Sequence, residues 1–199
     1  MSPSTQRRRL SAAERRADLL RAAREVFAVR GYHGASIDDI ASAAGVSKAL
    51  IYEHFAGKKD LHASLLAEEA GELFGRLGSA ASGGEDDEAR LRAGIDAFLG
   101  FVEERRDSFR ALLRDSAEPE LSDVLAQLQG QATAVIGSLM RPEPDADPAE
   151  VAMLAQQLSG AMQALASWWH DHQDVPRAQV LDAAMAFAWT GLERLRDQS

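Results

Sequence analysis

The segment 36–55 constrains the fold more than any other part of the sequence. It reads SIDDIASAAGVSKALIYEHF, two short amphipathic stretches with Gly45 between them. Ser36 and Ser47 can cap the two helix starts with their hydroxyls, and glycine permits the left-handed backbone of a tight turn. The residues expected to face inward are Ile40, Ala41, Val46, Ile51 and Phe55. The segment therefore predicts a helix-turn-helix, with the second helix leaving one face open to solvent.

The rest of the chain also has the periodicity of helices. Apolar residues recur at three- and four-residue spacing, and no sustained apolar-polar alternation favours strands. The segment from Ser11 to Glu14 forms a capping box that starts a helix, and Gly31 is expected to end it. The residues expected on its buried face are Leu19, Leu20, Ala23, Val26 and Phe27. We therefore expect an all-α protein.

Three breaks separate long helices in the remainder of the chain. They lie at residues 78–87, 116–119 and 141–148, where turn-forming residues cluster. Asp147 and Pro148 are typical of a helix start, and Pro176 is expected to open the last helix. We expect three parts: a flexible basic arm (1–10), a three-helix unit with the helix-turn-helix (11–57), and a larger helical region (58–199).

The charge of the chain is divided unevenly along its length. The net charge is −9 and the isoelectric point is near 5.0, yet residues 1–60 hold eleven Lys or Arg against seven Asp or Glu. The first part is therefore +4 and the remainder −13. A basic module suits a phosphate backbone, whereas an acidic body restricts contact to one end of the molecule. Ordinary solvated surface charge is the alternative interpretation.

Several classes of protein are excluded by composition. The sequence of 199 residues has no cysteine, which excludes disulfides, thiolate nucleophiles and cysteine-based metal sites. It has no run of eighteen apolar residues, and its arginine-rich start lacks the apolar stretch of a secretory signal. We therefore expect a cytoplasmic protein without a membrane partner.

The solvent face of the second motif helix carries the candidate DNA contacts. Lys48 can donate to guanine O6 or N7, while Ala49 and Leu50 can meet thymine methyl groups. Tyr52 and His54 are better placed for phosphate oxygens. The residues at or near helix starts that are expected to contact the phosphate backbone of DNA are Ser36, Ser47 and Lys58. This face can therefore both read bases and position the protein on the duplex.

Two neighbouring features allow more than one interpretation. Asp38 could accept a hydrogen bond from cytosine N4, repel phosphate, or point away from the DNA. The arm with Arg7, Arg8 and Arg9 could contact the minor groove or the backbone, or serve as a solubilising tail.

The motif and its surroundings resemble the TetR family over roughly residues 12–66. The residues that carry the resemblance are Gly31-Tyr32, Ser36-Ile37, Ile40-Ala41, Ala44-Gly45-Val46-Ser47-Lys48, Ile51-Tyr52, His54-Phe55 and Lys58-Lys59-Asp60-Leu61. The resemblance places Lys48, Ala49 and Leu50 at base-reading positions. It places Tyr52, His54 and Lys58 at phosphate-contact positions. It also implies that the larger region binds a ligand and forms a homodimer.

Apolar residues of the larger region are candidates for an effector pocket, because methionine and aromatic side chains adapt to bulky ligands. The candidates are Phe98, Phe101, Phe109, Met153, Met162 and Trp169. Packing in an ordinary core is the alternative for each of them.

Small residues in the last two helices suggest a subunit interface. In the resembled family the final two helices commonly form a four-helix dimer interface. The candidates are Gly160, Ala164, Trp168, Ala184, Phe187, Ala188, Gly191 and Leu192. Packing within one subunit is the alternative.

Other functions find little support. His170 and His172 point about 200° apart on a helix, so we expect no metal site and no cofactor. There is no Gly-rich phosphate loop, nucleophile motif or paired-acid constellation of an enzyme. A non-specific architectural DNA binder conflicts with the acidic remainder. We therefore expect a ligand-responsive transcription regulator, a repressor released from a palindromic operator by a small, largely apolar effector. Direct activation by the ligand stays open.

Overall fold

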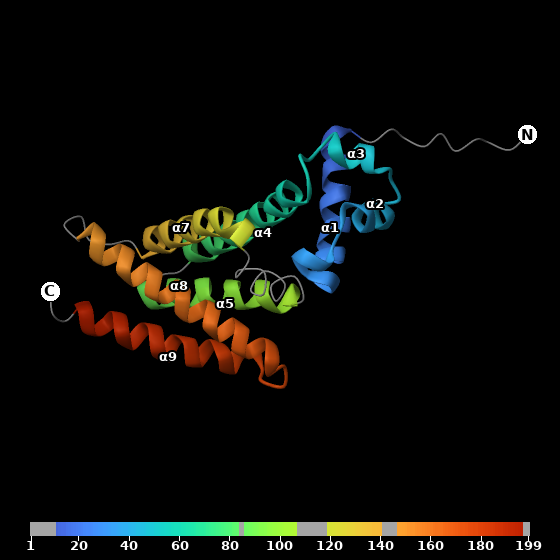
Figure 1. Ribbon diagram of the computed structural model, residues 1–199. Coiled ribbons are helices and arrows are strands. Elements are labelled where there is room, and N and C mark those ends of the chain that lie inside the picture. Colours follow the sequence, from blue (N-terminus) through green and yellow to red (C-terminus); the bar gives the residue numbers. More distant parts are fainter. Residues whose placement is uncertain (1–10, 84–85, 107–118, 141–146, 197–199) are drawn as a thin grey trace, which may run out of the picture. The chain divides into compact units, whose positions relative to one another are not determined.

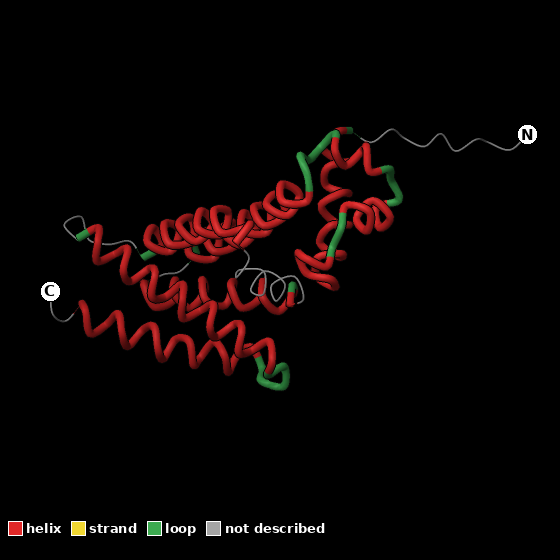
Figure 2. Tube along the Cα trace, viewed as in Figure 1, coloured by secondary structure: helices red, strands yellow, loops and turns green. Residues whose placement is uncertain are grey.

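The computed structural model describes residues 11–83, 86–106, 119–140 and 147–196, and within these ranges it contains helices, turns and loops but no strand (Figures 1 and 2). The elements are α1 (Ala12–Gly34), α2 (Ile37–Ala44), α3 (Lys48–Tyr52), α4 (Lys58–Ser82), α5 (Asp87–Glu104), the 3₁₀ turn η1 (Pro119–Leu121), α7 (Ser122–Leu139), α8 (Pro148–Asp171) and α9 (Arg177–Arg196). The all-α prediction is confirmed. The expected arm (1–10) and Phe109 lie outside the described residues. None of the described helices has the length and hydrophobicity needed to cross a membrane.

The chain divides into two compact units, Met1–Leu65 and Leu66–Ser199. The division falls inside α4, eight residues beyond the expected boundary between residues 57 and 58. Leu61 and His62 explain the difference, because both are buried, and the His62 ring meets the Phe27 ring edge-on at 4.5 Å. The first two turns of α4 thus complete the interior of the first unit.

The first unit is built on α1, α2 and α3. The capping box at Ser11 is present: its hydroxyl accepts from the Glu14 N–H, and the Glu14 carboxylate accepts from the Ser11 N–H. At Gly31 the backbone turns to φ 68°, and a final turn then carries the helix to Gly34. The expected end of α1 is therefore a kink. The buried core of the unit includes Leu19, Leu20, Phe27, Ile40, Ile51 and Phe55.

The second unit has its core between α5, α8 and α9. The core residues are Ile95, Leu99, Val102, Met162, Ala166, Trp169, Val180, Ala184, Met185 and Ala188. Figure 1 shows α8 and α9 as an antiparallel pair. The helix starts expected at Asp147 and Pro176 are confirmed: Asp147 caps α8, with Pro148 as its first residue, and α9 begins directly after Pro176.

A polar contact joins α7 to α8. The Gln129 amide donates to the Ser159 hydroxyl at 3.1 Å, and Gln163 donates to both groups at 3.0 and 3.1 Å. Ser159 is buried, so these bonds satisfy a polar group that would otherwise be costly to bury.

Candidate nucleic-acid interface and ligand-binding region

The turn between α2 and α3 has the geometry of a helix-turn-helix. Ser36 caps α2, since its hydroxyl accepts from the Asp39 N–H at 3.2 Å. Gly45 lies in the left-handed region at φ 65° and ψ 35°, and the Val46 N–H then donates to the Ala41 carbonyl at 3.0 Å. Ser47 caps α3 through the Leu50 N–H at 3.3 Å. The hydroxyls of both expected phosphate-contact serines therefore serve as caps.

The open face of α3 presents the expected reading residues unequally. Lys48, Ala49 and Tyr52 are exposed, whereas Leu50 is half-buried. Ile51 is fully buried on the opposite side and fixes the rotation of the helix. His54 follows α3 and is also half-buried. A DNA groove facing α3 would thus meet lysine, alanine and tyrosine first.

Two acidic side chains at the start of α2 form ion pairs, one of them with the open face of α3. The Lys48 Nζ lies 2.5 Å from Asp38 Oδ2, and the two side chains are 52% and 66% exposed. Arg30 and Asp39 form a second ion pair at 2.7 Å. The pKa of Asp39 lies below its ordinary value, chiefly because the Ser36 hydroxyl hydrogen-bonds to the carboxylate; Arg30 lowers it further, while partial burial opposes both.

Lys58 makes contacts that the sequence reasoning missed. Its ammonium group donates to the carbonyls of Tyr32 at 2.9 Å and Ala35 at 3.2 Å, and lies 4.4 Å from the centre of the Tyr32 ring. These carbonyls follow the kink in α1, where backbone oxygens lack helical partners and attract a cation. Two of the three ammonium protons are therefore engaged within the protein. The contact of Lys58 with phosphate stays a prediction, and these bonds leave one ammonium proton for it.

The five effector-pocket candidates that lie within the described residues do not all share one environment. Phe101, Met162 and Trp169 are buried, and the Trp169 indole N–H donates to the Val175 carbonyl at 2.8 Å. Phe98 is half-buried against the same core, whereas Met153 is 58% exposed on α8. The structure thus places Met153 apart from the other four described candidates.

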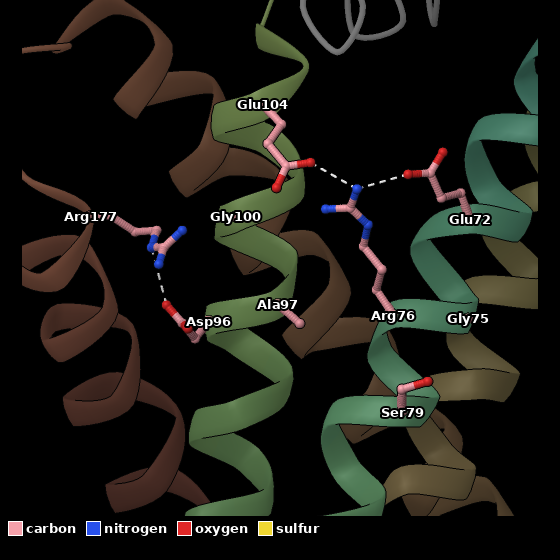
Figure 3. Close-up of a pocket in the computed structure, with 9 residues that line it drawn as sticks. All are labelled: Glu72, Gly75, Arg76, Ser79, Asp96, Ala97, Gly100, Glu104 and Arg177. Carbon is pink, nitrogen blue, oxygen red and sulfur yellow. Dashed lines mark hydrogen bonds and ion pairs between the residues drawn. The ribbon is translucent and has the colours of Figure 1, made fainter.

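The structure shows a groove of about 570 Å³ beside α4, α5 and α9, with several charged side chains in its lining (Figure 3). The residues lining it are Glu72, Gly75, Arg76, Ser79, Asp96, Ala97, Gly100, Glu104 and Arg177. No expected pocket residue is among them. Sequence reasoning missed the groove because charged residues at helical spacing are also typical of a solvated face. Among the described residues, no group of three or more His, Asp or Glu could hold a metal ion.

Ion pairs cross this groove between helices. Arg76 on α4 lies 2.8 Å from Glu72 of its own helix and 2.7 Å from Glu104 on α5 (Figure 3). The Arg76 hydrogen bond lowers the pKa of Glu104, and the same bond raises the pKa of the arginine. On the other side, Arg177 of α9 lies 3.2 Å from Asp96 on α5. Each arginine therefore links a neighbouring helix to α5.

The expected interface residues divide into two groups. Gly160, Ala164 and Trp168 are exposed on α8, and Phe187 is 66% exposed on α9. Ala184 and Ala188 are instead buried within the core of the second unit. This corrects their assignment to the interface, because their small side chains pack inside one subunit. The surroundings of Gly191 and of the Leu192 side chain lie outside what the structure describes.

A helix-turn-helix on a small helical unit, followed by a larger helical unit, is an arrangement typical of DNA-binding transcription regulators. The family model "Bacterial regulatory proteins, tetR family" matches residues 19–65. The model "Tetracyclin repressor-like, C-terminal domain" matches residues 88–191. The chain therefore belongs to the TetR family, and it is a DNA-binding transcriptional regulator and not an enzyme.

Three similar proteins illustrate the range of the family. The HTH-type transcriptional activator FasR of Mycolicibacterium smegmatis is 30% identical over 190 residues, which cover 94% of this chain and 87% of FasR. The HTH-type transcriptional repressor KstR2 of Rhodococcus jostii is 31% identical over 117 residues, 55% of this chain and 57% of KstR2. The solved structure of FadR from Bacillus subtilis in complex with stearoyl-CoA is 18% identical, with a TM-score of 0.71 over 86% of this chain and 96% of FadR.

Proposed function

We propose that this regulator is a dimeric repressor that leaves a palindromic operator when a small, largely apolar effector binds. In this proposal Lys48, Ala49 and Leu50 read base edges, and Tyr52 and His54 contact phosphates. Ser36 and Ser47 hold the starts of α2 and α3, where backbone N–H groups favour phosphate. Lys58 donates to the backbone carbonyls of Tyr32 and Ala35 and has one ammonium proton left for a phosphate oxygen.

The observation that carries the proposal is the exposure of Lys48, Ala49 and Tyr52 on a helix whose opposite side is anchored by Ile51. A short helix held in this way can enter a major groove without rearranging its own core. The unequal charge of the chain supports the same orientation, since residues 1–60 are net positive and the remainder net negative.

A gel-shift series with genomic fragments at several salt concentrations tests the DNA-binding part. We expect selective retention of some fragments, and a changed base preference when Lys48 is replaced by alanine. Lys59→Ala is the matched control, because Lys59 is an exposed lysine outside α3. It should weaken binding to all fragments similarly and reduce the salt dependence. The failure of every fragment to compete selectively would refute specific operator binding.

The dimer part is supported by the exposed apolar side chains of Trp168 and Phe187 on the helices α8 and α9. Gly160 and Ala164 expose small surfaces on α8, which would allow a partner helix to approach closely. A two-fold dimer would place its recognition helices about 34–36 Å apart or at a related spacing, which favours a palindromic operator.

As a specific candidate for the effector we propose a long-chain acyl-CoA thioester, in which the acyl chain is the apolar part that is recognised and the coenzyme A part is polar and charged. The interior between α5, α8 and α9 is apolar and filled by its own side chains, so an acyl chain would enter it by displacing a flexible side chain such as that of Met162. The similarity in fold to FadR, solved with stearoyl-CoA, supports the same class. Stearoyl-CoA should raise the thermal stability of the protein and release a bound DNA fragment, while coenzyme A alone should do neither. Equal effects of the two compounds would contradict recognition of the acyl chain.

Activation is a second candidate, favoured by the similarity to FasR, an activator, across 94% of this chain. A promoter–reporter assay with and without the regulator gene distinguishes repression from activation. Higher expression after deletion supports repression, and lower expression supports activation.

A further inference from the structure

Asp38 is the acidic side chain that contacts the proposed base-reading lysine. It lies in the first turn of α2, and its Oδ2 atom is 2.5 Å from the Nζ of Lys48, the first residue of α3. Both side chains are more than half exposed. A carboxylate and an ammonium group are therefore presented together on the face that we propose meets DNA.

The local helices explain why this pair forms. Lys48 directly follows the cap of α3, where the positive end of the helix dipole disfavours a cation. Asp38 is at the corresponding end of α2, where a carboxylate is favoured. The ion pair offsets the unfavourable position of the lysine and joins the two helices across the Gly45 turn.

These contacts of Asp38 stabilise the fold only modestly, because both partners are exposed. The neighbouring Asp39 completes the capping box of α2 and pairs with Arg30. Among the described residues, Asp38 forms an ion pair with Lys48 alone. A solvent-exposed acid facing phosphate lowers DNA affinity, and an isolated surface ion pair stabilises a fold by only a small amount. A role in discriminating operator DNA from other DNA accounts better for a carboxylate at this position.

We propose that Asp38 is a specificity-determining residue, and that Asp38 and Lys48 act as one donor–acceptor unit that reads a G·C base pair and rejects phosphate. In the major groove a G·C pair offers the O6 and N7 acceptors of guanine beside the N4 amino donor of cytosine. Lys48 donates to the guanine acceptors, and Asp38 accepts from the cytosine N4 amino group. Non-operator DNA meets the unit mainly through phosphates, where the carboxylate cancels the charge of Lys48 and repels the backbone. This inference rests on the proposed reading of bases by Lys48.

The test compares two duplexes, one recovered by the wild-type full chain from a random pool and one with the same composition scrambled. Fluorescence anisotropy measures the affinity for each. Asp38→Ala should tighten binding to scrambled DNA by roughly two- to five-fold per protomer, the range of an exposed ion pair, without tightening operator binding. The ratio of operator to scrambled affinity should therefore fall, and the preference for G·C at the position read by Lys48 should weaken.

Glu53→Ala is the matched control, because Glu53 is an exposed acid at the end of α3 and its loss changes the charge equally. It should strengthen binding to both duplexes by the same factor. In a Lys48→Ala background, Asp38→Ala should no longer change the ratio. Asp38→Asn keeps the side-chain size, and it should likewise tighten binding to scrambled DNA. Thermal unfolding should show both Asp38 variants folded.

Two results would overturn the inference in distinguishable ways. If Asp38→Ala changes the affinity for both duplexes by the same factor as Glu53→Ala, the aspartate acts only through net charge. The proposed reading of bases by Lys48 is then unaffected. If Lys48→Ala keeps the wild-type ratio of operator affinity to scrambled-DNA affinity, the proposed reading of bases by Lys48 is wrong. The proposed role of Asp38 is then wrong as well, because it depends on Lys48.

Discussion

Replacing Gly45 by alanine tests whether the left-handed turn holds the helix-turn-helix together. Gly45 has φ 65° and ψ 35°, and a Cβ added there would meet nothing within 4 Å. Steric clash with neighbours is therefore absent, and the cost is the backbone strain of an L-residue, about 1–2 kcal/mol. The hydrogen bond from the Gly45 N–H to the Ser42 carbonyl is retained. The strain should appear as an opening of the first unit.

Hydrogen exchange of peptides spanning residues 36–55 measures that opening. A loss of about 1–2 kcal/mol corresponds to exchange roughly 5- to 30-fold faster. Gly71→Ala is the control, since Gly71 lies inside α4 and its added Cβ would also meet nothing within 4 Å. In a regular helix the same substitution should stabilise by about 1 kcal/mol. Unchanged protection of 36–55 in the Gly45 variant would refute the claim that left-handed strain controls this turn.

Three further predictions follow from the contacts described above. Lys58→Met should destabilise the first unit by about 1–3 kcal/mol in urea unfolding, because two backbone carbonyls lose their donor, whereas Lys59→Met should change stability little. The lowered pKa of Asp39 means that its carboxylate stabilises the fold above the ordinary value of 3.8 and loses this effect as the pH falls through the folded pKa. At pH values below about 4, the urea concentration at the unfolding midpoint of the first unit should therefore decrease, and it should decrease less steeply in Asp39→Asn. An identical dependence of the midpoint on pH in the two proteins would contradict this. Phe187→Glu should produce monomers in sedimentation experiments, while Val29→Glu, at another exposed apolar residue, should not; a wild-type chain that sediments as a monomer would exclude the dimer model.

Much of the fold was predictable because its signals are local. The capping box at Ser11, the caps at Ser36 and Ser47, and the glycine turn depend on residues within four positions of one another. The same holds for the start of α8 at Asp147. Periodicity likewise placed Ile51 on the buried side of α3, which left Lys48 and its neighbours exposed.

The residues that sequence reasoning assigned differently all depend on distant partners. Lys58 follows a glycine turn and resembles any basic residue at a helix start, but its carbonyl partners lie 23 and 26 positions earlier. Ala184 belongs to a small-residue stripe that would suit either a partner subunit or its own core. Periodicity identifies a buried face without identifying the helix that covers it.

The sequence by itself therefore determined the helices, their caps, the helix-turn-helix and the family. The tertiary structure decided which charged atoms meet: Lys48 with Asp38, Lys58 with the carbonyls after the α1 kink, and Arg76 with Glu104. The reason is physical. Backbone hydrogen bonds and caps act over one helical turn, whereas the partner of a long charged side chain is set by how separate helices pack.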